Sequence, residues 1–100
     1  MRKITFIGAG NVASNLSIEL QKNGYKIVEI WSQSKISSQQ LANKLQCNWT
    51  TNLSKLKETD LFIIAVKDDV TEKVISKIKN KTTPIVHTSG SIGLNVFKKI

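Results

Sequence analysis

A glycine-rich turn near the amino terminus, Gly8-Ala9-Gly10, most constrains what this chain can fold into. It follows a short apolar segment, residues 3–7, and precedes a segment whose apolar residues recur with helical period. Such a turn between a strand and a helix is typical of a βαβ unit that binds a dinucleotide. Gly8 permits the tight turn, Gly10 lets the backbone approach a pyrophosphate, and Ala13 permits close packing of helix on strand. The alternative is a tight turn without a ligand.

The rest of the chain alternates between apolar segments of strand length and segments of helical period. We expect strands at residues 3–7, 26–31, 47–49, 61–66 and 85–87. We expect a helical turn at residues 53–56 and three helices, which begin after Gly10, at a cap on Ser37 or Ser38, and at Asp69. This alternation predicts an α/β fold of the Rossmann type: a doubly wound, mainly parallel sheet with helices on both faces.

Two helices carry a clear inward stripe. The first stripe is Val12, Ala13, Leu16 and Leu20, and the other is Val70, Val74, Ile75 and Ile78. Each stripe repeats at the spacing expected of one helical face. Gly24 stands where the first helix would take a left-handed C-terminal cap.

The length of 100 residues, without a repeat or a linker, predicts one domain. The chain ends on an amphipathic run, residues 95–100, with no signal that would stop a helix. We therefore expect residues 1–100 to be a dinucleotide-binding domain truncated from a longer protein.

The net charge is +8, which favours anionic partners. The lysines are spread along the chain, however, and solvated helix faces are the simpler interpretation. Because no recognition helix or RNA-binding motif is present, we expect no nucleic acid partner. No stretch approaches the ~18 apolar residues of a membrane span, so we also expect no membrane partner. The single cysteine, Cys47, has no partner for a disulfide or a metal site, so we expect no metal. A lone cysteine also suits a reducing compartment, and with no membrane span in the sequence we expect a soluble, cytoplasmic protein.

The end of the second strand bears on the choice of cofactor. A protein that selects NAD usually places a carboxylate about 20 residues beyond the glycines. Here that position holds Ser32, Gln33 and Ser34, followed by Lys35, and Glu29 lies inside the strand. Such a loop can donate hydrogen bonds to a 2′-phosphate and does not repel it. We therefore expect NADP(H) rather than NAD(H), although NADP sites often carry an arginine where this chain has Gln33.

Candidate chemical groups follow two later strands. His87, at the end of a strand, could donate a proton during reduction, or its ring could be satisfied by local hydrogen bonds. Ser89 could orient a substrate or serve as an ordinary turn residue. Asp68 and Asp69 suggest either acid/base or metal chemistry or an N-cap, and we favour the cap. Lys67 could steer an anionic cofactor.

Several of these segments together resemble a known family. Gly8-Ala9-Gly10-Asn11-Val12-Ala13, Trp31-Ser32-Gln33-Ser34 and Ala65-Val66-Lys67-Asp68 resemble the pyrroline-5-carboxylate reductase-like branch of the 6-phosphogluconate dehydrogenase superfamily. His87-Thr88-Ser89-Gly90-Ser91 is similar to a segment of Rossmann-like NADP oxidoreductases that carry a C-terminal domain called DUF2520. The resemblance covers essentially the whole chain, but only the N-terminal domain of that family.

The resemblance implies a role for each of the site residues. It implies that Gly10, Asn11 and Val12 contact the pyrophosphate and that Ser32, Gln33 and Ser34 contact the adenosine ribose phosphate. It also implies that Ala65, Val66 and Lys67 border the ribose and that residues 87–89 lie beside the nicotinamide. A C-terminal helical domain would close the pocket for an unknown small-molecule substrate and form a homodimer.

The function that we expect is therefore an NADP(H)-binding domain of an oxidoreductase related to pyrroline-5-carboxylate reductase. In isolation this domain should be inactive, because the substrate pocket needs the second domain. The alternative is a non-catalytic module that binds or senses a dinucleotide.

Overall fold

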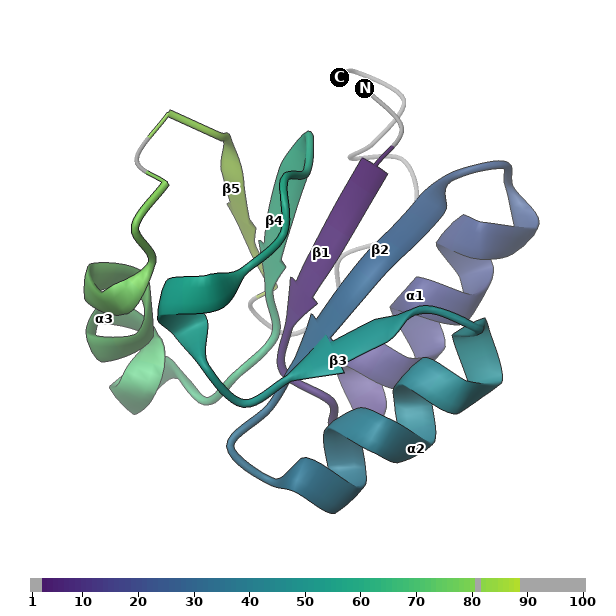
Figure 1. Ribbon diagram of the computed structural model, residues 1–100, viewed down its shortest axis with the longest axis horizontal. Helices are drawn as coiled ribbons and strands as arrows, with labels where there is room; N and C mark the ends of the chain where they lie inside the picture. Colours follow the sequence, from purple (N-terminus) through teal and green to yellow (C-terminus); the bar gives the residue numbers. More distant parts are fainter. Residues whose placement is uncertain (1–2, 81, 89–100) are drawn as a thin grey trace.

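The computed structural model describes residues 3–80 and 82–88, and within them it contains a five-stranded sheet. Its strands are β1 (Lys3–Ile7), β2 (Lys26–Trp31), β3 (Asn48–Thr50), β4 (Leu61–Ile64) and β5 (Ile85–His87). They lie in the order β3-β2-β1-β4-β5, and each neighbouring pair is parallel (Figure 1). This is the strand order of a doubly wound dinucleotide-binding sheet. The predicted α/β fold of the Rossmann type is confirmed.

Helices cover both faces of the sheet (Figure 1). On one side lie α1 (Asn11–Lys22) and α2 (Lys35–Leu45), and on the other lie α3 (Asp68–Lys77) and a short 3₁₀ helix, η1 (Leu53–Lys55). Each helix follows a strand and runs back along the sheet. The carboxyl ends of the strands and the amino ends of α1, α2 and α3 therefore gather at one edge, where open α/β sheets bind ligands.

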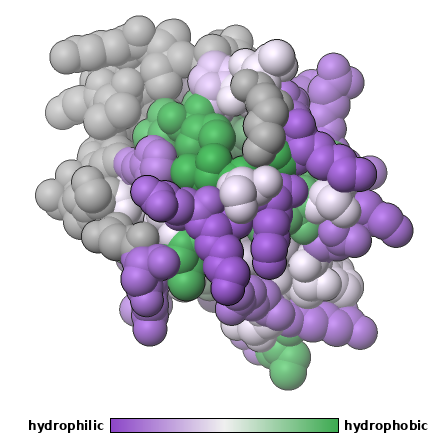
Figure 2. All heavy atoms as spheres, turned by 90° about the vertical axis from the view of Figure 1, so that its left-hand side faces the viewer, coloured by the Kyte–Doolittle hydropathy of each residue, from purple (hydrophilic) through white to green (hydrophobic). Residues whose placement is uncertain are grey.

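The two layers bury separate apolar clusters. Under α1 and α2 the core is built around Phe6, Leu20 and Ile30, and under α3 it is built around Phe62, Val74 and Ile78. Seen from the side of α3 and β5, an apolar patch lies above a larger area of hydrophilic side chains (Figure 2). In the described ranges no helix is both long and apolar enough to cross a membrane.

The start of α1 corrects one prediction and its end confirms another. Val12 was expected in the inward stripe, but it is 46% exposed. The helix begins at Asn11 and turns Ala13, Leu16, Ser17 and Leu20 toward the sheet, which leaves Val12 about a quarter turn off this face. At the other end Gly24 has φ +91°, and the amide of Tyr25 donates to the Leu20 carbonyl. This is the left-handed cap that was predicted.

The starts of β3 and α2 differ from the predicted ones because of local hydrogen bonds. The amide of Cys47 donates to the Ala42 carbonyl at the end of α2, so β3 begins one residue later than predicted, at Asn48. The cap of α2 is Ser34 rather than Ser37 or Ser38, because the Ser34 hydroxyl accepts from the amide of Ser37 at 3.2 Å. The hydroxyl of Ser38 is buried and donates to backbone carbonyls within the helix.

The strand β4 is shorter than predicted. It ends at Ile64, whereas the apolar run had suggested residue 66. Ala65 and Val66 instead belong to the connection into α3, and the Ala65 carbonyl lies against Gly8. This connection forms part of the site.

Candidate functional site

Gly8 lies where the carboxyl ends of β1, β2 and β4 meet. Its amide donates to the Trp31 carbonyl at 2.7 Å, and its backbone has φ +125°, which side chains of L-residues rarely allow. A Cβ at this position would lie 2.3 Å from the Ala65 carbonyl oxygen. Glycine is therefore required here by the packing of three strands, whether or not a ligand binds.

Gly10 has a different role. It is the N-cap residue of α1 with φ −81°, a value open to any residue, and no described atom beyond its chain neighbours and the helix's own backbone lies within 4 Å of where its Cβ would be. Among the described residues no side chain caps this helix end, and no acidic residue occupies its first turn. The backbone N–H groups at the start of α1 are thus left for an anion, in the geometry that binds phosphates at helix amino termini.

A cleft of about 560 Å³ opens beside this helix end. It is lined by the glycine turn, by Trp31, Ser32, Gln33 and Ser34 after β2, by Ala65, Val66 and Lys67 after β4, and by Asp69, Val70 and Val74 of α3. Most of the residues predicted to bind the cofactor therefore meet in one cleft. Asn11 and Val12 are outside its lining, although both are exposed in the first turn of α1 beside it.

The loop after β2 presents hydroxyl groups to this cleft. Ser32 is buried, and its hydroxyl accepts from the amide of Ser34 at 3.1 Å. The Ser34 hydroxyl accepts from the amide of Ser37 as the cap of α2. Among the described residues neither hydroxyl donates a hydrogen bond, so each O–H can still donate to a ligand. Gln33 between them is exposed and lines the cleft.

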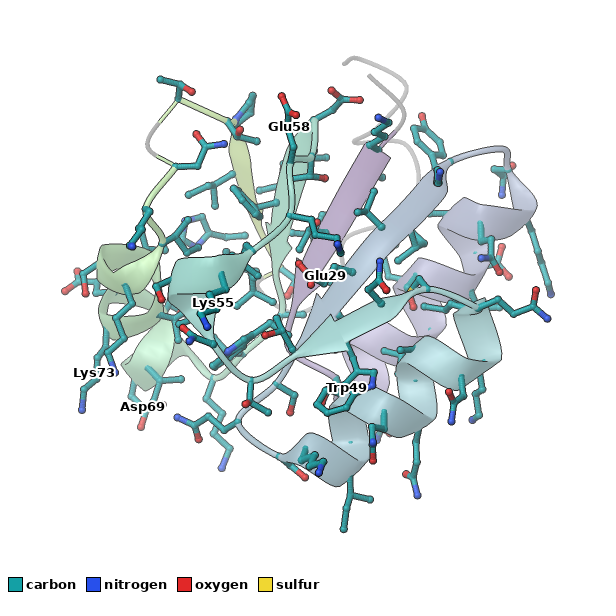
Figure 3. All side chains as sticks on the ribbon, viewed as in Figure 1. Glu29, Trp49, Lys55, Glu58, Asp69 and Lys73 are labelled. Atoms are coloured by element: carbon teal, nitrogen blue, oxygen red, sulfur yellow. The ribbon has the colours of Figure 1, made fainter. Side chains whose placement is uncertain are left out.

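Lys35 does not join these groups. Its Nζ lies over the ring of Trp49, 5.9 Å from the centroid, which is a cation–π arrangement. Trp49 lies on β3 next to α2 (Figure 3). The cation expected to help a 2′-phosphate thus lies over Trp49 and does not line the cleft.

The start of α3 corrects the assignment of its cap. Lys67, not Asp68 or Asp69, is the N-cap residue, and it makes no side-chain capping bond. Its backbone is extended, so the carboxylate of Asp69 falls in the first turn of the helix, where negative charge is favourable. Lys67 is exposed and lines the cleft as predicted for a residue that steers an anion.

The walls of the cleft hold three residues that sequence reasoning placed elsewhere. Val70 and Val74 were predicted only as the inward stripe of α3, and Trp31 entered only as the first residue of a segment that resembles the family. The indole Nε1 of Trp31 is buried and has no hydrogen-bond partner among the described residues. Buried donors are rarely left unpaired, and one in the wall of a cleft is readily explained by a bound group or water.

Of the two candidate catalytic residues, His87 can be placed relative to this cleft. His87 is exposed at the end of β5 and is not in the cleft lining. Thr88 ties this strand end to β4, since both its amide and its hydroxyl donate to the Ile64 carbonyl. Ser89 lies outside the described residues. Among those residues no group of three or more His, Cys, Asp and Glu side chains could hold a metal ion.

Glu29 is the buried carboxylate that the sequence placed inside β2. It is 3% exposed and accepts a hydrogen bond from the amide of Lys57 at 2.8 Å, on the η1 side of the sheet (Figure 3). It is therefore committed to holding the segment before β4 and is unsuited to a ribose. Burial, with a smaller contribution from the charge of Glu29, raises the pKa of the Cys47 thiol to about 11. Cys47 is accordingly a poor nucleophile at neutral pH.

Comparisons with known proteins agree with this geometry. A family model described as "NADP oxidoreductase coenzyme F420-dependent" matches residues 3–89. Among solved structures, the chain is similar to a protein from Bacteroides fragilis described as an NADP oxidoreductase. The two share 34% sequence identity with a TM-score of 0.82 over 96% of this chain and 39% of that one. A search of curated proteins found no match.

More distant structures share the fold. A 1-pyrroline-5-carboxylate reductase from Streptococcus pyogenes is 24% identical with a TM-score of 0.71, over 97% of this chain and 37% of its own. An NADPH-dependent oxidoreductase from Desulfitobacterium hafniense is 19% identical with a TM-score of 0.73, over 85% of this chain and 26% of its own. The chain thus spans well under half the length of each of these relatives.

Proposed function

The chain belongs to the family described as NADP oxidoreductase, coenzyme F420-dependent, and on that premise we propose that its cleft binds NADP(H) for an oxidoreductase. The observation that carries the proposal is the uncapped amino end of α1 at Gly10, which opens into the cleft formed by the loops after β1, β2 and β4. An anion-binding helix end at the point where the strand order reverses is the arrangement that holds a pyrophosphate.

The residues present fit a dinucleotide along the length of the cleft. The N–H groups that follow Gly10 would hold the pyrophosphate, and the absence of a Cβ there lets it approach the backbone. The apolar side chains of Trp31, Val70 and Val74 offer a surface for the adenine. When bound, NADPH supplies a hydride for reduction. The protein's own part is to bind the dinucleotide and to set its direction across the sheet edge.

The preference for NADP over NAD is supported by the loop after β2. No carboxylate is present from Ser32 to Lys35 to accept from ribose hydroxyls or to repel a phosphate. The hydroxyls of Ser32 and Ser34 each retain a donor. We expect NADPH to bind more tightly than NADH, and we expect the difference to shrink as salt screens the phosphate charge.

For the whole protein, we propose an oxidoreductase of the pyrroline-5-carboxylate reductase-like branch with a DUF2520-type helical domain after this one. That domain would supply most of the pocket for a small-molecule substrate and the dimer contacts. His87, at the carboxyl edge of the sheet, would then lie toward the nicotinamide. The similarity to the Bacteroides fragilis NADP oxidoreductase over 96% of this chain supports the assignment to an oxidoreductase.

Calorimetric titration with NADPH tests the proposal on the chain as it stands. The wild-type chain should bind, and Gly10→Val should not, because the new side chain would occupy the space that the pyrophosphate needs. Asn43→Val, an exposed position on α2 outside the cleft, is the matched control and should bind normally. Far-ultraviolet circular dichroism should show all three chains equally folded. Equal affinity of the wild type and Gly10→Val, or no binding by the wild type, would overturn the proposal.

A further inference from the structure

A second cleft of about 710 Å³ adjoins the first on the η1 side. Trp31 and Gln33 belong to the linings of both, so the two clefts share a wall at the end of β2. The second cleft is completed by Thr51, Asn52, Leu53 and Ser54, and by Lys77 at the end of α3. Its lining holds a cation, amides and hydroxyls, and none of these residues is acidic.

The polar wall of this cleft is held in a defined shape. The Asn52 side-chain oxygen accepts from both the amide and the hydroxyl of Ser54, at 2.9 and 2.7 Å, which caps η1. The amide of Asn52 in turn donates to the Thr50 hydroxyl at 3.0 Å. Residues 50–54 are therefore braced by their own hydrogen bonds, and a ligand would meet an already ordered surface.

The region around Gln33 needs a positive charge from outside its own loop if it is to bind a phosphate well. Gln33 itself carries none, and Lys35 is drawn to the ring of Trp49. Lys67 lines only the first cleft, at the amino end of α3. Among the described residues, Lys77 is the cation that shares the second cleft with Gln33, although the two lie far apart in the sequence.

Resting on the NADP(H) proposal, we infer that Lys77 is a specificity-determining residue that binds the 2′-phosphate of the dinucleotide beside Gln33, which lines both clefts. The phosphate dianion is the group that distinguishes NADP from NAD. An ammonium that faces this group strengthens NADP(H) binding without acting on NAD(H). Gln33 and the hydroxyl groups around it supply neutral hydrogen bonds to the same phosphate.

The test compares Lys77→Gln with Lys73→Gln in calorimetric titrations of the full chain with NADPH and with NADH. Lys73 lies one turn earlier on α3, is exposed, lines neither cleft and extends outward from the helix (Figure 3). Both variants lower the net charge by the same amount, so they share any long-range effect. We expect Lys77→Gln to weaken NADPH binding about fivefold, as for a partly exposed ion pair, with NADH unchanged. Lys73→Gln should leave both affinities unchanged.

Three results would overturn the role of Lys77. The first is an equal loss of NADPH affinity in both lysine variants, which would indicate only long-range attraction. The second is a Lys77→Gln chain that binds NADPH like the wild type, and the third is one that loses NADPH and NADH affinity equally. If the wild type still binds NADPH more tightly than NADH, the proposed function survives these results. Failure of the wild type to bind either dinucleotide would remove both.

Discussion

Replacement of Gly8 by alanine should destabilise the fold strongly. The added Cβ would lie 2.3 Å from the Ala65 carbonyl oxygen and 2.8 Å from the Ala65 carbonyl carbon, both of them backbone atoms that cannot turn aside. Relief would need movement of β1 against β4 at the centre of the sheet. Such overpacking costs about 1–3 kcal/mol, and a non-glycine residue at φ +125° adds about 1–3 kcal/mol of backbone strain.

We therefore expect Gly8→Ala to lower the free energy of unfolding by roughly 2–6 kcal/mol, a large part of a typical domain's 5–15 kcal/mol. The melting temperature should fall by at least about 8 °C, at some 4 °C or more per kcal/mol. Urea denaturation and thermal melting followed by circular dichroism measure both quantities.

Gly10→Ala is the matched control for this prediction. Gly10 has φ −81° and open space at its Cβ position, so its replacement should change stability by less than about 1 kcal/mol. The reasoning is refuted if Gly8→Ala unfolds within about 1 kcal/mol of the wild type, or if the two alanine variants are equally destabilised.

Two further predictions concern buried polar groups away from the cleft. Thr5 Oγ1 is buried without a hydrogen-bond partner among the described residues, so Thr5→Val should raise the free energy of unfolding by about 1 kcal/mol. Thr59→Val removes the hydrogen bond from Oγ1 to the Lys3 carbonyl and should lower the free energy of unfolding by about 1 kcal/mol. Urea denaturation measures both changes, and a Thr5→Val variant less stable than Thr59→Val would contradict the reasoning. Because the pKa of Cys47 is raised from 9.0 to about 11, its alkylation by iodoacetamide should keep accelerating as the pH rises from 9 to 11. Glu29→Gln should move that rise to lower pH, and a wild-type rate that levels off near pH 9 is the contrary result.

The parts of the fold that were predictable are those with strong local patterns. Residues 3–7 and 26–31 form β1 and β2 as expected, because each is a short apolar run followed by residues that turn the chain. Gly24 was recognisable as a helix cap because few other residues adopt its backbone conformation. Local reasoning of the same kind identified the glycine turn, the loop after β2 and Lys67 as parts of the cleft, whereas Ala65 and Val66 were expected there only from the family resemblance.

Other features depended on choices that the local sequence leaves open. Ser34, Ser37 and Ser38 can all cap a helix, and the hydrogen bond from the amide of Ser34 to Ser32 helps to select the first of them. Lys35 could have faced the cleft, but its position opposite Trp49 depends on the pairing of β2 with β3. Lys77 lies far from Gln33 in sequence, and only the packing of α3 beside η1 brings them to one cleft.

The central claim is that a dinucleotide lies along the cleft that begins at Gly10. A titration of the ¹⁵N-labelled chain with NADPH, followed by amide chemical shifts, tests this residue by residue. The account predicts the largest shifts at Gly10, Gln33 and Ala65, which line the cleft. Shifts confined to the groove between α1 and α2, around Ser14 and Lys44, or no shifts at all, would contradict it.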